Sequence, residues 1–141
     1  MSRPVRIVVI DAQGGGVGRQ LIPAVKAVAP GAQVTAVGTN SAAAAAMRKA
    51  GADLAAAGEN AVVVACRTAD VILGPIGIVI ADAMLGEITP AMALAVGQST
   101  AQRILIPFDR CANLVAGVAE LNMGALIKSA VRELEKVLET R

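Results

Sequence analysis

The sequence contains no histidine, tryptophan or tyrosine, and Phe108 is its one aromatic residue. Without histidine there is no Ser-His or Cys-His nucleophile pair, no imidazole base and no histidine-containing metal site. A single aromatic side chain cannot form the stacking platform on which single-stranded nucleic-acid binders hold bases. Any enzyme chemistry must therefore use carboxylates, a thiol or backbone dipoles.

Charge and long hydrophobic runs are also scarce. Charged residues make up 17% of the chain, and the net charge is +2, without a basic stripe of the kind that binds nucleic acid. The apolar stretches are interrupted before the roughly 20 residues of a membrane span, and the N-terminus lacks the layout of a secretory signal. Cys66 and Cys111 are too few for a disulfide framework. We expect a cytoplasmic protein with no membrane and no nucleic-acid partner.

Hydrophobic residues, by contrast, make up 55% of the 141 residues. A chain of this length fits one domain, residues 1–141, and has no room for a second, substrate-binding domain. The apolar content exceeds what one small core requires. We interpret the surplus as subunit contacts and expect a homo-oligomer.

Strand-length apolar runs alternate with helical patterns, which is typical of a parallel sheet covered on both faces. This predicts an α/β fold: a single doubly wound, Rossmann-like domain with a mostly parallel sheet of five to six strands. The expected strands are residues 5–11, 34–37, 53–57, 70–73 and 103–108, with 114–118 as an antiparallel edge strand. The expected helices are residues 20–28, 41–49, 59–68, 77–85, a segment from 90 onward, and 123–139.

Capping residues support several of these helices. Ser41 is a candidate N-cap, as are Thr89, which precedes Pro90, and Asn122. The last helix is amphipathic, because apolar residues recur at helical spacing while charged residues face outward. Only five residues separate the fifth strand from residues 114–118, which is too short for a parallel crossover and favours a hairpin.

The most informative segment is Ile7-Val8-Val9-Ile10-Asp11 followed by Ala12-Gln13-Gly14-Gly15-Gly16-Val17-Gly18-Arg19. A buried strand that enters a glycine-rich loop and then a helix builds a nest of backbone N–H groups for a phosphate. Gly15 and Gly18 keep the spacing of the second and third fingerprint glycines of dinucleotide-binding proteins, but Gln13 takes the place of the first. A nucleotide or another phosphorylated small molecule is the expected ligand.

Departures from other phosphate loops narrow this hypothesis. Arg19-Gln20 stands where a P-loop has lysine and a hydroxyl residue, so NTP hydrolysis has little support. Pro23 would fall inside a helix that began at Gly16. We therefore expect the helix to begin late, near Arg19, or to have a distorted first turn.

The end of the second strand bears on the choice of nucleotide. An acid that binds the ribose of NAD is expected about 20 residues after the loop, but Gly38-Thr39-Asn40-Ser41 has none. The polar groups here suit a ribose or a 2′-phosphate, with Arg48 as a counter-charge. NADP or a mononucleotide fits slightly better than NAD.

A second glycine turn, Gly74-Pro75-Ile76-Gly77, follows the fourth strand and should face the same crevice. Glu59 and Asn60 follow the third strand near the same rim, where a helix cap is the simpler explanation. The candidate cofactor-binding residues are Asp11, Gln13, Gly14, Gly15, Gly16, Val17, Gly18, Arg19, Thr39, Asn40, Glu59, Asn60, Gly74, Pro75, Ile76 and Gly77. A purely structural role for both glycine turns remains the alternative.

Few side chains qualify for catalysis, and no catalytic residue is assigned. Asp11 is expected to bond the N–H groups of the glycine turn. Asp82 stands in an apolar run, where an unpaired buried carboxylate is costly, so we expect it to face solvent, a subunit interface or a ligand. Cys111, next to Arg110 and Asp109, lacks a neighbouring base, and Cys66 is a core residue.

The chain resembles a family of small bacterial proteins known as a domain of unknown function. The resemblance covers nearly the whole chain and implies a Rossmann-like fold without implying an activity. It is carried by the motifs Ile10-Asp11-Ala12-Gln13-Gly14-Gly15-Gly16-Val17-Gly18, Gly38-Thr39-Asn40, Gly51-Ala52-Asp53, Gly58-Glu59-Asn60-Ala61, Gly74-Pro75-Ile76-Gly77-Ile78-Val79-Ile80-Ala81 and Leu85-Gly86-Glu87-Ile88-Thr89-Pro90.

Three functional hypotheses follow. The first is a nucleotide- or dinucleotide-binding protein that senses or carries its ligand in an oligomer, with no metal. The second is a ligand-free structural or assembly subunit in which the glycines only allow tight turns. The third is a small NADP-dependent reductase completed by a partner. The lack of histidine and of an obvious acid–base pair favours binding over turnover.

Overall fold

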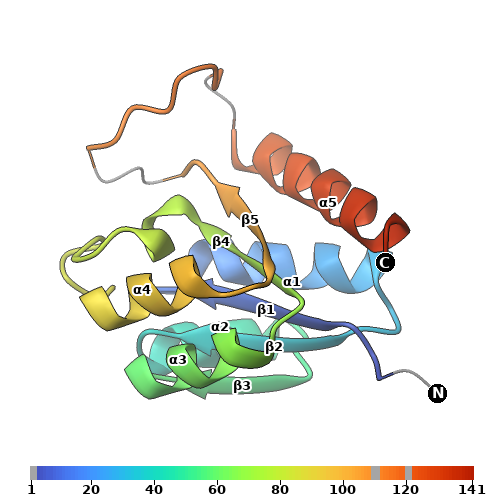
Figure 1. Cartoon of the computed structure of the whole chain (residues 1–141), viewed down its shortest axis with the longest axis horizontal. Helices are drawn as coiled ribbons and strands as arrows, with labels where there is room; N and C mark the ends of the chain where they lie inside the picture. Colours follow the sequence, from blue (N-terminus) through green and yellow to red (C-terminus); the bar gives the residue numbers. More distant parts are fainter. Residues whose placement is uncertain (1–2, 109–111, 120–121) are drawn as a thin grey trace.

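A computed structural model describes residues 3–108, 112–119 and 122–141. The described chain forms a Rossmann-like α/β fold around one five-stranded sheet, in which all four strand pairings are parallel and the order is β3-β2-β1-β4-β5. Figure 1 shows the strands side by side with helices in front and behind. The strands are β1 (Arg6–Asp11), β2 (Gln33–Gly38), β3 (Leu54–Ala57), β4 (Val71–Pro75) and β5 (Gln102–Ile106).

Alternate residues of the strands form two separate hydrophobic cores. Ile7 and Val9 of β1 pack with α1 (Gly16–Val28), α2 (Ser41–Lys49) and α5 (Met123–Glu139). Val8 and Ile10 pack on the opposite face with α3 (Glu59–Thr68) and α4 (Pro90–Gln98). The sheet is therefore doubly wound, as its apolar runs predicted.

Most helix boundaries agree with the predictions, and two of the three expected caps form. Asn122 accepts a hydrogen bond from the Ala125 N–H at 2.9 Å, and Thr89 accepts one from the Met92 N–H at 3.2 Å. The expected cap of α2 at Ser41 is wrong. Asn40 is the N-cap, because its side chain accepts the Ala43 N–H at 2.9 Å while its own backbone is extended.

The start of α1 also differs from the prediction. The helix begins at Gly16, not near Arg19, and includes Pro23 in its interior. Pro23 has no N–H to donate to the Arg19 carbonyl, so this helix carries one hydrogen bond fewer. The rest of α1 compensates by burying Leu21, Ile22 and Val25 completely against the sheet.

The expected helix over residues 77–85 does not form. A short 3₁₀ helix, η1 (Ile76–Val79), is followed by consecutive turns through Glu87. Asp82, Met84 and Leu85 have φ angles of 67°, 56° and 57°, in the left-handed region. An apolar run of this kind does not distinguish a helix from a packed irregular segment, and here Ile78, Ala83, Met84 and Ile88 are buried. Asp82 is exposed to solvent.

The expected antiparallel strand over residues 114–118 is also absent from the described chain, so the sheet has five strands and β5 forms one of its edges. Gly117 has a φ of 82°, which interrupts extended backbone, and Leu114 is 95% exposed, so this segment buries too little to pair as a strand. Asp109, Arg110 and Cys111 lie outside the described residues.

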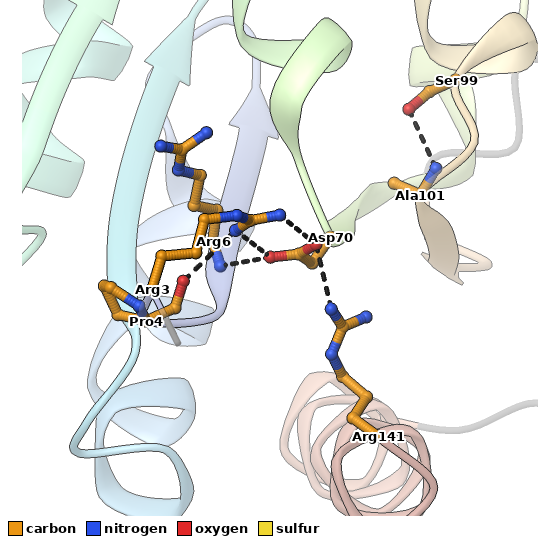
Figure 2. Close-up of polar contacts among 7 residues, drawn as sticks. All are labelled: Arg3, Pro4, Arg6, Asp70, Ser99, Ala101 and Arg141. Carbon is orange, nitrogen blue, oxygen red and sulfur yellow. Dashed lines mark hydrogen bonds and ion pairs between the residues drawn. The ribbon is translucent and has the colours of Figure 1, made fainter. Parts of the chain in front are cut away.

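Asp70, which precedes β4, lies at the amino-terminal ends of the strands and holds both chain ends there. Its carboxylate accepts hydrogen bonds from the guanidinium groups of Arg3 and Arg141 and from the Arg6 backbone N–H (Figure 2). The Arg3 hydrogen bond is the main cause that holds the pKa of Asp70 well below its usual range. This cluster ties both ends of the described chain to the sheet, on the side away from the glycine loop.

Candidate functional site

The glycine-rich loop lies at the carboxyl end of β1, where it turns the chain into α1. Gln13 and Gly15 adopt left-handed backbone conformations, with φ angles of 52° and 74°. Gly15 is the N-cap of α1, and its N–H donates to the Ala12 carbonyl at 3.0 Å. The strand, loop and helix predicted from the sequence are therefore present.

Asp11, the last residue of β1, is 4% exposed and lies under this loop. Its carboxylate accepts the Gly18 N–H at 2.7 Å and the Ala12 N–H at 2.8 Å. Burial raises the pKa of Asp11, and the N–H groups of Gly18, Ala12 and Val17 offset only part of that effect. Asp11 thus fills part of the helix N-terminus with a carboxyl group from the chain itself, as expected from its sequence position.

The four glycines of the loop have two different roles. Gly15 and Gly18 serve packing: a Cβ at Gly15 would lie 3.0 Å from the Ala43 carbonyl oxygen, and one at Gly18 would overlap the Met47 side chain. At Gly14 and Gly16 a Cβ would have no atom within 4 Å. These two glycines leave the backbone open to solvent and to a ligand.

A carboxylate that the sequence interpretation did not include among the site residues also lies on the loop. Glu87 Oε1 accepts hydrogen bonds from the Thr39 hydroxyl at 2.6 Å, the Gln13 N–H at 2.8 Å and the Asn40 side-chain amide at 2.9 Å. Burial alone raises the pKa of Glu87, but these hydrogen bonds outweigh it and hold the pKa below its ordinary value. The half-buried Glu87 is therefore ionised at neutral pH.

These contacts decide which loop N–H groups are available. Ala12 and Gly18 donate to Asp11, Gln13 donates to Glu87, and Gly15 donates to Ala12. Among residues 3–108, 112–119 and 122–141, the N–H groups of Gly14 and Gly16 donate to no protein acceptor. They are thus the two donors of the loop that can bind a ligand.

Both of these glycines line a pocket of about 220 Å³ beside the loop. The pocket spans the carboxyl ends of β1 and β4, and Met84, Phe108 and Met123 supply apolar walls. Its lining residues are Asp11, Ala12, Gln13, Gly14, Gly16, Val17, Gln20, Pro75, Met84, Phe108 and Met123.

The remaining predicted site residues do not line this pocket. Thr39 and Asn40 lie at the end of β2 and contact Glu87 rather than the pocket. Gly74 packs against β1, where a Cβ would overlap the Ile10 carbonyl oxygen, and Gly77 is buried. Ile76 begins η1 and, like Arg19, does not line the pocket.

Glu59 and Asn60 are separated from this pocket. They are exposed in the first turn of α3, where Glu59 suits the positive end of the helix dipole. The N-cap is Gly58, without a side-chain cap hydrogen bond, so the helix cap expected at Glu59 and Asn60 does not form. Met84, Phe108 and Met123 were not predicted as site residues, because an apolar side chain in a sequence does not distinguish a pocket wall from the core.

The chemistry of the described residues is limited. Groups of three or more potential metal ligands are absent from the part of the chain that the structure describes. Cys66 is buried in the core between α3 and the sheet, and burial raises the pKa of its thiol to about 11, which keeps it protonated and unreactive. Within the same residues no helix has the length and hydrophobicity of a membrane span.

Comparison with known proteins gives one match. A family model described as "Domain of unknown function (DUF3842)" matches residues 6–139. Neither the curated proteins nor the solved structures give a match. The match covers the whole sheet, the glycine loop, Glu87 and α5.

Proposed function

Because the chain belongs to the DUF3842 family, whose description assigns no activity, we propose from its own residues that it binds a nucleotide or dinucleotide. The observation that carries this proposal is that Gly14 and Gly16, whose N–H groups donate to no acceptor among the described residues, both line a pocket of about 220 Å³. Such donors at a helix N-terminus attract a phosphate through both hydrogen bonds and the helix dipole.

The strand order supports the same site. The order β3-β2-β1-β4-β5 is that of the first five strands in dinucleotide-binding sheets, where ligands bind at the point at which the order reverses. Here that point lies between β1 and β4, whose ends supply Asp11 and Pro75 to the pocket. A volume of about 220 Å³ is smaller than the roughly 300–1,000 Å³ of pockets for whole ligands, so the pocket suits one end of a nucleotide.

Binding without turnover fits the side chains around this pocket. Its carboxylate, Asp11, is engaged by loop N–H groups, and the nearby Glu87 is engaged by three donors. Asp11 is engaged on both carboxylate oxygens, and the chain has no histidine to take a proton from a substrate. We therefore propose a protein that senses or carries its ligand.

A ligand-free structural role remains the second candidate, and one observation favours it. Asp11 and Glu87 already satisfy N–H groups that a phosphate nest leaves open, and their charges oppose an incoming anion. In that case the loop would serve only to connect β1 with α1. The two candidates differ in whether a nucleotide stabilises the folded chain.

The experiment is a thermal-shift and calorimetric titration of the full chain with NAD, AMP, ATP and inorganic phosphate. A ligand at about 100 times its Kd should add roughly 2.7 kcal/mol to the free energy of unfolding. Gly16→Ala and Gly14→Ala place a methyl group in open space, so both variants should fold but lose the ligand-induced shift. Gly97→Ala in α4, also in open space, is the control that should keep it.

Each contrary result has a definite meaning. If none of the four ligands stabilises the wild-type chain, the binding proposal fails and the structural role stands. If Gly16→Ala and Gly14→Ala keep the full shift, the nucleotide binds elsewhere on the molecule.

We further propose that the protein forms a homo-oligomer through α3 and α4. Helix α4 contains no charged residue, and Leu94 on its outer side is 57% exposed. Together with Val63 and Ala91, Leu94 lines a groove of about 540 Å³ between the two helices. An apolar surface on an uncharged helix is the property of a contact between subunits.

A further inference from the structure

Glu87 places a carboxylate at the end of β2, although it lies 48 residues beyond Thr39 in the sequence. Its three donors come from the loops that follow β1 and β2, so the carboxylate bridges the carboxyl ends of these neighbouring strands. Asn40 completes the arrangement, because its amide also donates to the Gln13 carbonyl at 3.0 Å. The carboxylate is thus fixed beside the proposed phosphate site.

This is the position at which dinucleotide-binding proteins distinguish their cofactors. An acid at the end of the second strand binds the ribose hydroxyls of NAD, whereas an arginine there accommodates the 2′-phosphate of NADP. The segment Gly38-Thr39-Asn40 has neither residue. We propose that Glu87 takes the role of that acid, so that the site selects adenine nucleotides with a free ribose 2′-hydroxyl. This inference rests on the proposed nucleotide-binding function.

The hydrogen bonds of Glu87 leave it able to accept more. Within residues 3–108, 112–119 and 122–141, the three hydrogen bonds to this carboxylate all end on Oε1. An ionised carboxylate is an acceptor only, with about four lone-pair sites on its two oxygens. Oε2 is therefore free to accept ribose hydroxyl groups, which are donors.

Charge argues against a 2′-phosphate at the same position. A phosphate next to the ionised Glu87 would meet a like charge, which is strongly unfavourable in a partly desolvated site. The cation considered from the sequence, Arg48, is in the last turn of α2, roughly 10 Å along the helix from Ser41. There its charge helps to lower the pKa of the Asp53 carboxyl, which directly precedes β3 at the amino-terminal end of the sheet. On this proposal the site favours NAD, whereas Gly38-Thr39-Asn40-Ser41 alone favours NADP or a mononucleotide.

The first test compares matched ligand pairs on the wild-type chain by isothermal titration calorimetry. We expect NAD to bind at least tenfold more tightly than NADP, and AMP at least tenfold more tightly than adenosine 2′,5′-bisphosphate. Equal affinities within each pair would overturn this inference and leave nucleotide binding intact. Binding by none of the four would overturn the proposed function, and this inference with it.

The second test assigns the selectivity to Glu87. Glu87→Gln keeps an acceptor oxygen for Gln13, Thr39 and Asn40 but removes the charge, so the preference for NAD over NADP should shrink at least tenfold. Glu139→Gln, at the exposed end of α5, is the control with the same change in net charge and should leave the preference unchanged. An unaltered preference in a folded Glu87→Gln protein would overturn the role of Glu87.

Discussion

The Thr39 hydroxyl donates a hydrogen bond of 2.6 Å to the Glu87 carboxylate and thereby connects the end of β2 to the turns that follow β4. A hydrogen bond to a charged acceptor contributes about 1.5–3 kcal/mol, and the half-exposed position of this pair favours the lower value. Thr39→Val, which keeps the side-chain shape, should lower the free energy of unfolding by about 1.5 kcal/mol in urea denaturation.

The control for this prediction is Thr68→Val, which changes an exposed threonine at the end of α3. It should change the free energy of unfolding by less than about 0.5 kcal/mol, as surface substitutions usually do. Equal effects of the two substitutions would show that the Thr39–Glu87 contact adds no stability.

This contact also marks the limit of what the sequence could predict. The strand-length apolar runs, the glycine loop and the amphipathic residues of α5 are local patterns, and they predicted the five parallel strands, the loop and both ends of that helix, although not the absence of a sixth strand. Glu87 gave no such pattern. Glu87 reaches Gln13 because the backbone before it turns at Asp82, Met84 and Leu85, three non-glycine residues with left-handed φ angles. Side-chain periodicity does not reveal such conformations.

The two wrong elements have the same physical origin. Residues 77–85 and 114–118 are apolar enough for a helix or a strand, but hydrophobicity alone does not specify which residues find a partner surface. In the first segment Asp82, Met84 and Leu85 have left-handed φ angles, which fit neither a helix nor a strand. Gly86 and Gly117 have positive φ angles, as turns require. Glycine at these two positions was therefore the sequence signal that favoured a turn over a helix or a strand.

Leu85 itself gives a prediction about strain. Its φ of 57° is unfavourable for a branched side chain, and its 96% exposure provides almost no burial in return. Asparagine tolerates this conformation better, so Leu85→Asn should raise the free energy of unfolding by about 0.5–1 kcal/mol. The measurement is urea denaturation, with Leu54→Asn on the extended strand β3 as the control that should bring no gain. A loss of stability in Leu85→Asn would mean that the leucine makes a contact in solution.

The Asp70 cluster predicts how stability depends on pH. Hydrogen bonding to Arg3, followed by the Arg6 N–H and the charge of Arg141, places the folded-state pKa of Asp70 below its unfolded value of about 3.9. A group with a lowered pKa stabilises the folded state above the unfolded pKa and loses that contribution as the pH falls toward the folded pKa. Wild type should therefore exceed Asp70→Asn in stability at pH 7, and the difference should shrink below about pH 4.

The expected difference at pH 7 is about 1–3 kcal/mol, because the substitution leaves the Arg6 N–H and two guanidinium groups with a weaker acceptor. Urea denaturation at pH 7, 5 and 3 measures it, with Asp82→Asn as the control at an exposed carboxylate. A difference that stayed constant down to pH 3 would show that the pKa of Asp70 is not lowered by folding.

Substitutions at two exposed leucines distinguish self-association through α3 and α4 from association through any exposed hydrophobic side chain. Leu94 lies in the groove between these helices, whereas Leu114, 95% exposed, lies on the segment after β5. If the groove is the subunit contact, Leu94→Asp removes an apolar side chain and forces a carboxylate out of water there, which should convert the oligomer to a monomer in size-exclusion chromatography with light scattering. Leu114→Asp should leave the oligomer intact. A wild-type chain that is monomeric at every concentration would contradict the proposed contact, and dissociation by Leu114→Asp alone would move it to the other side of the molecule.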